Sequence, residues 1–387
     1  MKQRNHIDVA LMIAVLILMF MSLGIVYSAS SSWALEKYGE SERMLLSHAI
    51  KVVLGIMMLF IGMMIDYHMI KRYTKIALVV GVTLLAVTLV MGGEAKGATR
   101  WLRFASLGFQ PSEFAKYALL FHLCTLIAMK KSLVRDLKHG FLPMVAWIAI
   151  VTVLVMKQPN FSMGAMIFFL SLMVLFMGGV KLSHVAMLFA IVVPLLAIYM
   201  LSAEYRRVRV MSYISGNATA AQHNYQLWQG ILGFGNGGIF GVGLGESKQR
   251  DLFLPESYGD FVFSIVGEEY GLLGTMSIML LFLFIMLRGF RIARHAEDGF
   301  GRNLAITITM AITLYALVNA SVTLGVVPTT GLPMPFVSYG GSSMVFSAFV
   351  LGVLLNISSQ TELYPRVVQV PVVGEVSADG SAVGKVY

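Results

Sequence analysis

Cysteine is almost absent from this chain, whose 387 residues contain only Cys124, inside an apolar run. A single thiol excludes a disulfide within the chain and a zinc site built from cysteines. Charged residues are also scarce, at 13% of the sequence, whereas hydrophobic residues make up 57%. A water-soluble protein needs more charge to cover its surface, so the composition predicts a protein that lies in the lipid bilayer.

Long apolar runs dominate the sequence instead. About ten segments have the 17 to 25 mostly apolar residues that span a bilayer. They lie at 9–29, 48–66, 73–91, 113–129, 141–157, 161–178, 183–201, 261–287, 303–325 and 337–357. We therefore predict an all-α polytopic membrane protein with a long extracytoplasmic loop, 202–260, between helices 7 and 8. The first run exceeds the apolar region of a signal peptide and lacks a clear cleavage site, so we expect a retained helix.

Basic residues give the predicted topology. The formal net charge is +9, but Lys and Arg concentrate in cytoplasmic loops of membrane proteins, so nucleic-acid binding is not indicated. Alternating the spans places the basic clusters on one side, at 2–4, 71–75, 130–138 and 288–302. Both termini are then cytoplasmic. Residues 1–361 are predicted to form one transmembrane domain, and 362–387 a flexible tail because they lack helical periodicity.

Asp260 lies where the loop 202–260 meets the following span. A half-desolvated carboxylate at such a position is a good general base for removing a proton from a hydroxyl group. An aspartate at the start of a helix can equally serve as its N-cap. Both interpretations stay open, and they are compatible with each other.

Glu268 and Glu269 follow in the same span, about 12 Å deeper along the helix at 1.5 Å per residue. Carboxylates at this depth require partners, protonation or a water-filled cavity. We consider two hypotheses: an intramembrane function for at least one of them, or ion pairs that hold helices together.

Glu113 and Lys116 are three residues apart at the start of the fourth span, so they share a helix face and can neutralise each other. A structural ion pair is one hypothesis, and direct contact of Lys116 with an anionic substrate is the other. Ser112 directly follows Pro111, a combination that predicts Ser112 as the N-cap of this helix.

Basic residues on the predicted outer side run against the usual distribution of charge. They are Lys96, Arg100, Arg103, Arg206, Arg207, Arg209, Lys248 and Arg250. A diphosphate-bearing partner would account for them because Arg and Lys bind phosphate oxygens strongly. Lipid headgroups at the membrane interface are the alternative.

Two glycine-containing segments favour close packing. The stretch 233–247 follows no strand and lacks the Gly-Lys-Ser/Thr ending of a nucleotide-binding loop, so we expect a packed re-entrant or interfacial loop. Residues 340–343, Gly-Gly-Ser-Ser, lie where the chain enters the last span. Close backbone packing is expected there, with a polar contact from Ser342 to a ligand as the alternative.

Four segments together make the sequence recognisable. They are 101–116, the glycine-rich loop that ends in Glu246-Ser247-Lys248-Gln249, the stretch 254–269, and 328–343 with the sequence PTTGLPMPFVSYGGSS. Together with the ten-span layout, they resemble the SEDS family of shape, elongation, division and sporulation proteins. The Val-Gly-Glu-Glu segment at 266–269 is more similar to the FtsW branch than to the RodA branch.

The resemblance implies a peptidoglycan glycosyltransferase that polymerises lipid II onto a nascent glycan strand and releases polyprenyl diphosphate. Asp260 matches the family's catalytic aspartate, which would act as general base for the acceptor 4-hydroxyl. We assign the diphosphate to Arg103, Arg209 and Lys248, with Lys116 and Ser342 as further substrate-binding candidates. No residue is assigned to a metal, although a divalent cation, Mg²⁺ or Mn²⁺, beside the diphosphate is compatible with the resemblance.

The implied partners are a class B penicillin-binding protein that crosslinks the strands, other divisome membrane proteins, and membrane lipids. The implied location is the bacterial inner membrane, enriched at the division septum. The chain departs from the family at Tyr258-Gly259, where His-Thr is usual, and at Asn160, where Asp is commoner. A lipid II flippase, a RodA-type elongation polymerase and a non-catalytic scaffold are the alternatives.

Overall fold

The computed structural model describes residues 5–91, 93–95, 98–104, 107–202, 204, 207–208, 211, 213, 225–255 and 257–363. Within this part, nine helical segments are long and apolar enough to cross a membrane, and α6 is a shorter apolar helix. The bounds are α1 (Val9–Tyr38), α2 (Arg43–Met64), α3 (Tyr67–Met91), α4 (Pro111–Lys130), α5 (Leu142–Lys157), α6 (Phe161–Met177), α7 (Leu182–Ser202), α11 (Val262–Arg294), α12 (Gly299–Thr323) and α13 (Gly341–Ser358). The 3-10 helix η1 (Lys131–Arg135) and the π-helix η2 (Leu137–Phe141) connect α4 to α5. The predicted polytopic all-α fold is confirmed.

Two predicted loops contain secondary structure that hydropathy did not indicate. The loop after α3 includes the antiparallel strands β1 (Gly93–Ala95), β2 (Ala98–Phe104) and β3 (Leu107–Phe109), which pair in sequence order. The long loop before α11 includes α10 (Tyr225–Gly237) and the π-helix η3 (Gln249–Phe253). Such short elements carry too few apolar repeats to be recognised from sequence. Residues 364–387 of the predicted tail lie outside the described residues.

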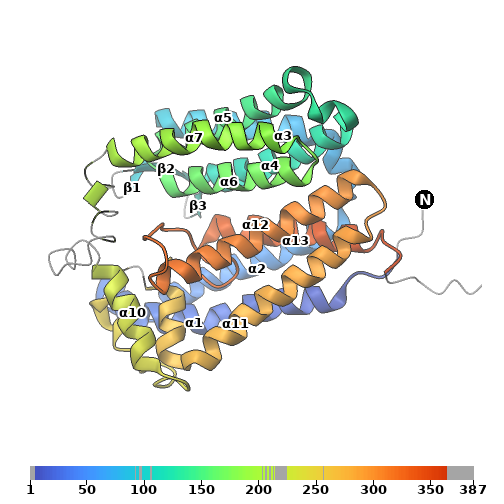
Figure 1. Cartoon of the computed structure of the whole chain (residues 1–387). Coiled ribbons are helices and arrows are strands. Elements are labelled where there is room, and N and C mark those ends of the chain that lie inside the picture. Colours follow the sequence, from blue (N-terminus) through green and yellow to red (C-terminus); the bar gives the residue numbers. More distant parts are fainter. Residues whose placement is uncertain are drawn as a thin grey trace, which may run out of the picture.

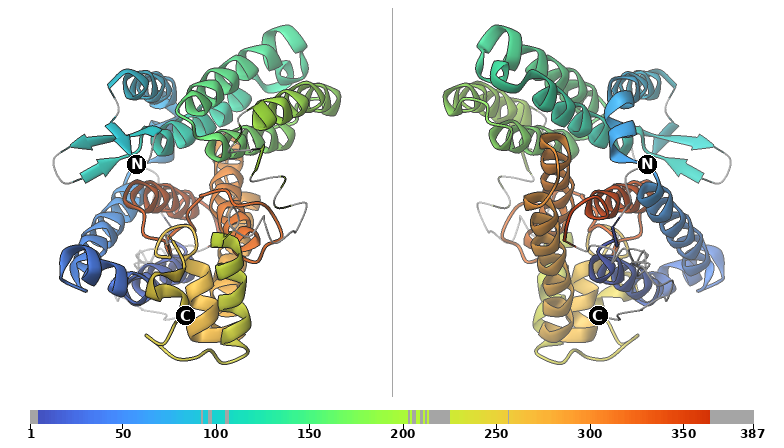
Figure 2. Two further views of the ribbon diagram at one scale, coloured as in Figure 1. Left: turned by 90° about the vertical axis from the view of Figure 1, so that its left-hand side faces the viewer. Right: turned by 90° about the vertical axis from the view of Figure 1, so that its right-hand side faces the viewer.

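The long helices run side by side along a common direction (Figure 1). Strands β1–β3 and helix α10 lie at one end of this bundle, which we call the sheet end. Viewed end on, the sheet projects from the side of the bundle next to α3 (Figure 2). Helices α12 and α13 are the most buried of the membrane helices among the described residues, and α7 is the least. The core therefore forms around α12 and α13, and α7 lies at the periphery.

Glycines bring α2 and α13 into direct backbone contact. A Cβ added at Gly352 would lie 2.1 Å from the main-chain oxygen of Leu59, and one at Gly62 would lie 2.3 Å from that of Phe349. No side chain fits in either place. Small residues let membrane helices approach closely, and close approach supplies the dispersion contacts that hold such helices together in lipid.

Helix α11 is interrupted at Gly271, whose φ of 65° and ψ of −159° are not helical. The glycine-rich segment after α10 supplies the hydrogen bonds that the interrupted helix loses. Val242 and Gly243 donate their amides to the oxygens of Glu268 and Glu269, at 2.9 and 3.1 Å. In the other direction, the amides of the two residues that follow Gly271 donate to the main-chain oxygens of Gly238 and Ile239. The backbone of this segment is thus built into α11, as the prediction of a closely packed loop anticipated.

We expect Gly352→Ala to destabilise the protein, because the new Cβ would overlap the α2 backbone. Overpacking of this kind costs about 1–3 kcal/mol. The measurement is the apparent Tm of purified protein in detergent. Gly24→Ala in α1 is the matched control, since a Cβ at Gly24 has no neighbouring atom within 4 Å. Equal melting of Gly352→Ala and wild type would contradict the observed helix contact.

Candidate functional site

Asp260 lies at the sheet end, directly before α11, and its side chain is partly buried. The N-cap of α11 is Phe261, so the interpretation of Asp260 as the helix cap is wrong. Asn319 of α12 fixes this position: its Nδ2 donates to the main-chain oxygens of Asp260 and Leu332, both at 2.8 Å. Gly331 borders the carboxylate, because a Cβ there would lie 3.4 Å from Oδ2 of Asp260.

Asn319 was not predicted from the sequence, although a signal existed. It is a buried polar residue within an apolar span, and polar residues at membrane depth often mark functional sites. Its two hydrogen bonds join the start of α11 to the loop between α12 and α13. The side chain of Asn319 therefore anchors the main chain of Asp260 to α12 and to the loop that follows it.

An aromatic cluster borders Asp260 on the side of α1 and α2. The ring of Tyr258 packs against Trp33 at 5.2 Å and against Tyr339 at 5.7 Å, edge to face. The Tyr339 amide also donates to the Tyr258 oxygen at 2.9 Å. Burial raises the pKa of Tyr258 to about 12, and the nearby charge of Asp260 adds to the shift. At neutral pH, Tyr258 therefore has a protonated hydroxyl that can donate a hydrogen bond.

Glu268 binds helix α10 and the segment that follows it. Its carboxylate accepts from Asn236 Nδ2 at 3.1 Å, from Ser247 Oγ at 2.5 Å and from the Gln249 amide at 3.1 Å. These donors lie on α10 and on the segment that follows it. The buried charge is stabilised by hydrogen bonds, as a carboxylate at membrane depth requires.

Glu269 joins the same loop to α1. It accepts hydrogen bonds from Ser28 Oγ and from the Gly245 amide. Two more contacts fasten the loop to α1: Ser257 donates to the oxygen of Ala29, and Ser32 donates to Asp251. The two glutamates thus form hydrogen bonds with α10, with α1 and with the segment between α10 and α11. Among the described residues, neither forms an ion pair between helices.

Glu113 and Lys116 form the predicted ion pair, with Nζ 2.7 Å from Oε2 and side chains only 3% and 2% exposed. Aromatic rings of Tyr117 and Tyr315 surround the ammonium at 4.5 and 4.1 Å from their centroids. The N-cap of this helix is Gln110, so the prediction of Ser112 as N-cap is wrong. Burial encloses Lys116 within the protein, and its contact with substrate stays a prediction.

Ser342 contacts the protein main chain. Its Oγ accepts from the Gln110 amide at 2.9 Å and donates to the Gly108 oxygen at 3.3 Å. The hydroxyl thereby joins the start of α13 to β3 and the start of α4. A role in substrate binding would require it to exchange one of these bonds.

The three basic residues assigned to the diphosphate are described to different extents. Lys248 is exposed and directly precedes η3, in the loop bound by Glu268. Arg103 lies in β2, but its side chain is outside the described part of the structure, as is the whole of Arg209. Their roles stay predictions.

Among the described residues, no group of three or more His, Cys, Asp or Glu side chains is arranged to hold a metal ion. These residues thus supply no ligand set for the predicted Mg²⁺ or Mn²⁺, and no chemical step is assigned to it.

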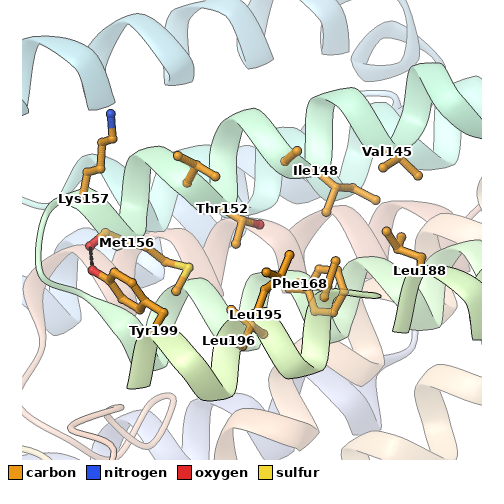
Figure 3. A pocket seen from close by; sticks show the side chains of 13 residues that line it. Val145, Ile148, Thr152, Met156, Lys157, Phe168, Leu188, Leu195, Leu196 and Tyr199 are labelled. Atoms are coloured by element: carbon orange, nitrogen blue, oxygen red, sulfur yellow. Dashed lines mark hydrogen bonds between the residues drawn. The ribbon is translucent and has the colours of Figure 1, made fainter. Parts of the chain in front are cut away.

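A cavity of about 440 Å³ lies between α5, α6 and α7 (Figure 3). Its wall is largely aliphatic and aromatic, with Ile148, Phe168 and Leu195 among the lining residues. Lys157 and Tyr199 lie at one end of it (Figure 3). None of the candidate site residues lines this cavity, so it is separate from the Asp260 site.

The fold and the site define an integral-membrane protein with a partly buried carboxylate, Asp260, directly before α11. The buried side chains of Glu268 and Glu269 hold the loop that leads to it. A profile of the FtsW/RodA/SpoVE family, described as a cell cycle protein, matches residues 9–363. The chain belongs to this family, and the resemblance predicted from its motifs is confirmed.

Relatives match along almost the whole chain. A protein of Geobacter metallireducens called probable peptidoglycan glycosyltransferase FtsW is 35% identical, covering 94% of this chain and 98% of its own length. Stage V sporulation protein E of Bacillus subtilis is 33% identical, covering 91% and 96%. A solved chain from work on a peptidoglycan synthase complex, described as coordinating polymerization and crosslinking, has a TM-score of 0.75 at 25% identity and covers 92% and 98%. RodA of Thermus thermophilus shares the fold, with a TM-score of 0.68 at 24% identity over 92% and 98%.

We expect Glu268→Ala to release the loop before α11, because the buried donors of Ser247 and Gln249 lose their acceptor, as does the exposed amide of Asn236. Unsatisfied buried donors cost about 1–3 kcal/mol each. The variant should have a lower apparent Tm in detergent, and a protease should cleave it faster within 238–255. Glu246→Ala is the control, since Glu246 is an exposed carboxylate on the same segment. Wild-type melting and cleavage of Glu268→Ala would show that the loop is held by other contacts.

The ion pair in α4 gives a second expectation. Lys116→Met leaves Glu113 buried without its counter-ion, which costs about 3–5 kcal/mol. Adding Glu113→Leu removes the orphaned charge and should recover most of the lost stability. Apparent Tm values of the two single variants, the double variant and wild type measure the coupling. Strictly additive losses would refute a mutually neutralising pair.

Proposed function

We propose that the chain is a peptidoglycan glycosyltransferase that polymerises lipid II into glycan strands during cell division. The observation that carries the proposal is Asp260, a partly buried carboxylate held at the sheet end by Asn319. The expected enzyme class agrees with the names of the curated relatives. Their match over nearly the whole chain supports carrying that activity over.

The proposed reaction uses Asp260 as general base. The carboxylate takes the proton of the acceptor sugar's 4-hydroxyl, and the freed oxygen attacks the anomeric carbon of the donor. The bond between that carbon and the diphosphate oxygen breaks, and polyprenyl diphosphate leaves with the electron pair. The fixed main chain around Asp260 favours this chemistry, because a base contributes most when it is oriented in advance.

The leaving diphosphate carries charge that cations must stabilise. Lys248 is exposed in a loop whose position Glu268 fixes, so it suits this role, and Arg103 and Arg209 are proposed beside it. Oriented cations at a departing phosphate lower the barrier of such reactions. A divalent cation carried by the diphosphate itself would act in the same sense.

The proposed orientation places the sheet end outside the cytoplasm and both termini inside it. The basic clusters at 71–75, 130–138 and 288–302 then face the cytoplasm, as the positive-inside rule requires. The protein is a multi-pass membrane protein, and we place it in the bacterial inner membrane, enriched at the division septum. The names of the FtsW relatives support a septal role over elongation.

A class B penicillin-binding protein is the proposed partner. The solved assembly that matches this chain is described as coordinating polymerization and crosslinking. Crosslinking requires a transpeptidase, and the Asp260 site supplies only glycosyl transfer. Other divisome membrane proteins and membrane lipids complete the proposed surroundings, and no nucleic-acid partner is proposed.

The proposal is tested by replacing Asp260. Purified wild type, with its class B penicillin-binding protein, should convert fluorescent lipid II into glycan ladders in the presence of moenomycin, which silences contaminating polymerases. Asp260→Asn keeps the shape but removes the base, so we expect a rate loss of about 10²–10⁴-fold. Ladder formation is quantified by gel electrophoresis over time.

Glu246→Gln is the matched control, because it neutralises an exposed carboxylate at the same end of the bundle. It should polymerise lipid II at the wild-type rate. An Asp260→Asn variant that folds and polymerises normally would overturn the proposal. Lipid II transfer across vesicles by wild type, without any ladders, would favour the flippase. The absence of both activities would favour a scaffold.

A further inference from the structure

A lysine lies inside the membrane helix α2 near the proposed active site. Lys51 is about 12 Å from the start of α2, at 1.5 Å per residue. Its side chain is partly exposed. A cation at membrane depth is costly and marks a functional site by default. The motifs of the sequence do not include this residue, because it belongs to an otherwise ordinary apolar span.

The ammonium of Lys51 rests on an aromatic ring. Its Nζ lies 3.4 Å from the centroid of Tyr339, and its aliphatic stem lies beside Gly341, where an added Cβ would be 3.5 Å from Cε. Within the described part of the chain, no carboxylate forms an ion pair with it. Among the described residues, Lys51 thus contacts the neutral side chain of Tyr339 in place of a counter-ion.

Tyr339 connects this cation to the segment that carries Asp260. Its amide donates to the Tyr258 oxygen at 2.9 Å, and the two rings meet edge to face at 5.7 Å. On its other side, the Tyr339 hydroxyl is 3.0 Å from Ser47 Oγ. Only one ring therefore separates the Lys51 ammonium from Tyr258, two residues before the proposed base.

We infer that Lys51 binds the diphosphate of the polyprenyl-linked substrate, an inference that rests on the proposed function. A cation on a ring face is held more weakly than one that donates charge-assisted hydrogen bonds to phosphate oxygens. The flexible lysine stem lets the ammonium leave Tyr339 for an anion in the membrane interface. Tyr339 positions the ammonium before the substrate arrives.

The test measures binding of undecaprenyl diphosphate to the full-length protein in detergent, with undecaprenol as the uncharged probe. Lys51→Met keeps the length and removes the charge, so it should weaken binding of the diphosphate by about 10-fold or more. Lys51→Arg should retain most of the affinity. Undecaprenol should bind all variants equally, and lipid II polymerisation by Lys51→Met should show a raised KM.

Lys37→Met is the matched control. The Lys37 ammonium also rests on a ring, 4.4 Å above Trp33, and Trp33 packs on Tyr258. It is exposed at the end of α1, outside the membrane interior. Its loss should leave diphosphate binding unchanged, which separates loss of a ring contact from loss of an anion-binding cation.

The inference is overturned if Lys51→Met binds undecaprenyl diphosphate like wild type, or if it loses both probes together with a lowered Tm. Its failure is distinguishable from failure of the proposed function. Normal polymerisation and binding by Lys51→Met removes the inference alone. Absence of polymerisation in wild type, with diphosphate binding that still requires Lys51, removes the glycosyltransferase and keeps the anion site.

Discussion

The interrupted helix α11 is the constraint on which the sheet end depends. A membrane helix cannot leave amides and carbonyls unpaired in hydrocarbon, yet Gly271 breaks the helical ladder of α11. The segment 238–243 closes the gap by pairing with the backbone on both sides of Gly271. The loop before α11 is consequently a structural part of the bundle, and its position is fixed wherever α11 is folded.

The two buried glutamates extend this constraint to the site. Glu268 holds the donors of α10 and the following segment, while Glu269 holds the same loop against Ser28 of α1. The loop then reaches Asp260, which Asn319 fixes from α12. The main chain of Asp260 is thereby joined to the surrounding helices, as its proposed role as general base requires.

The sequence predicted the helices well because a membrane helix is recognisable by length and hydropathy alone. It also placed Asp260 directly before a membrane helix and paired Glu113 with Lys116, since spacing along one helix determines that contact. Asn319, Lys51 and the strands β1–β3 escaped prediction. Their roles depend on contacts between elements far apart in the chain, and a single polar residue in a span does not reveal its partner. The caps of α4 and α11 differ from expectation by one residue or two, because cap positions depend on local backbone angles.

The charged side chains inside the helix bundle differ in how deeply they are buried and in which groups they contact. Glu113 and Lys116 neutralise each other in the packed interior, and the pair contributes to folding. Lys51 lies nearer the sheet end, and its ammonium contacts the side chain of Tyr339 with no counter-ion among the described residues. A cation with no counter-ion is tolerated where water or an anion reaches it. The same helix bundle therefore contains a closed pair that stabilises it and an open cation that an incoming diphosphate can neutralise.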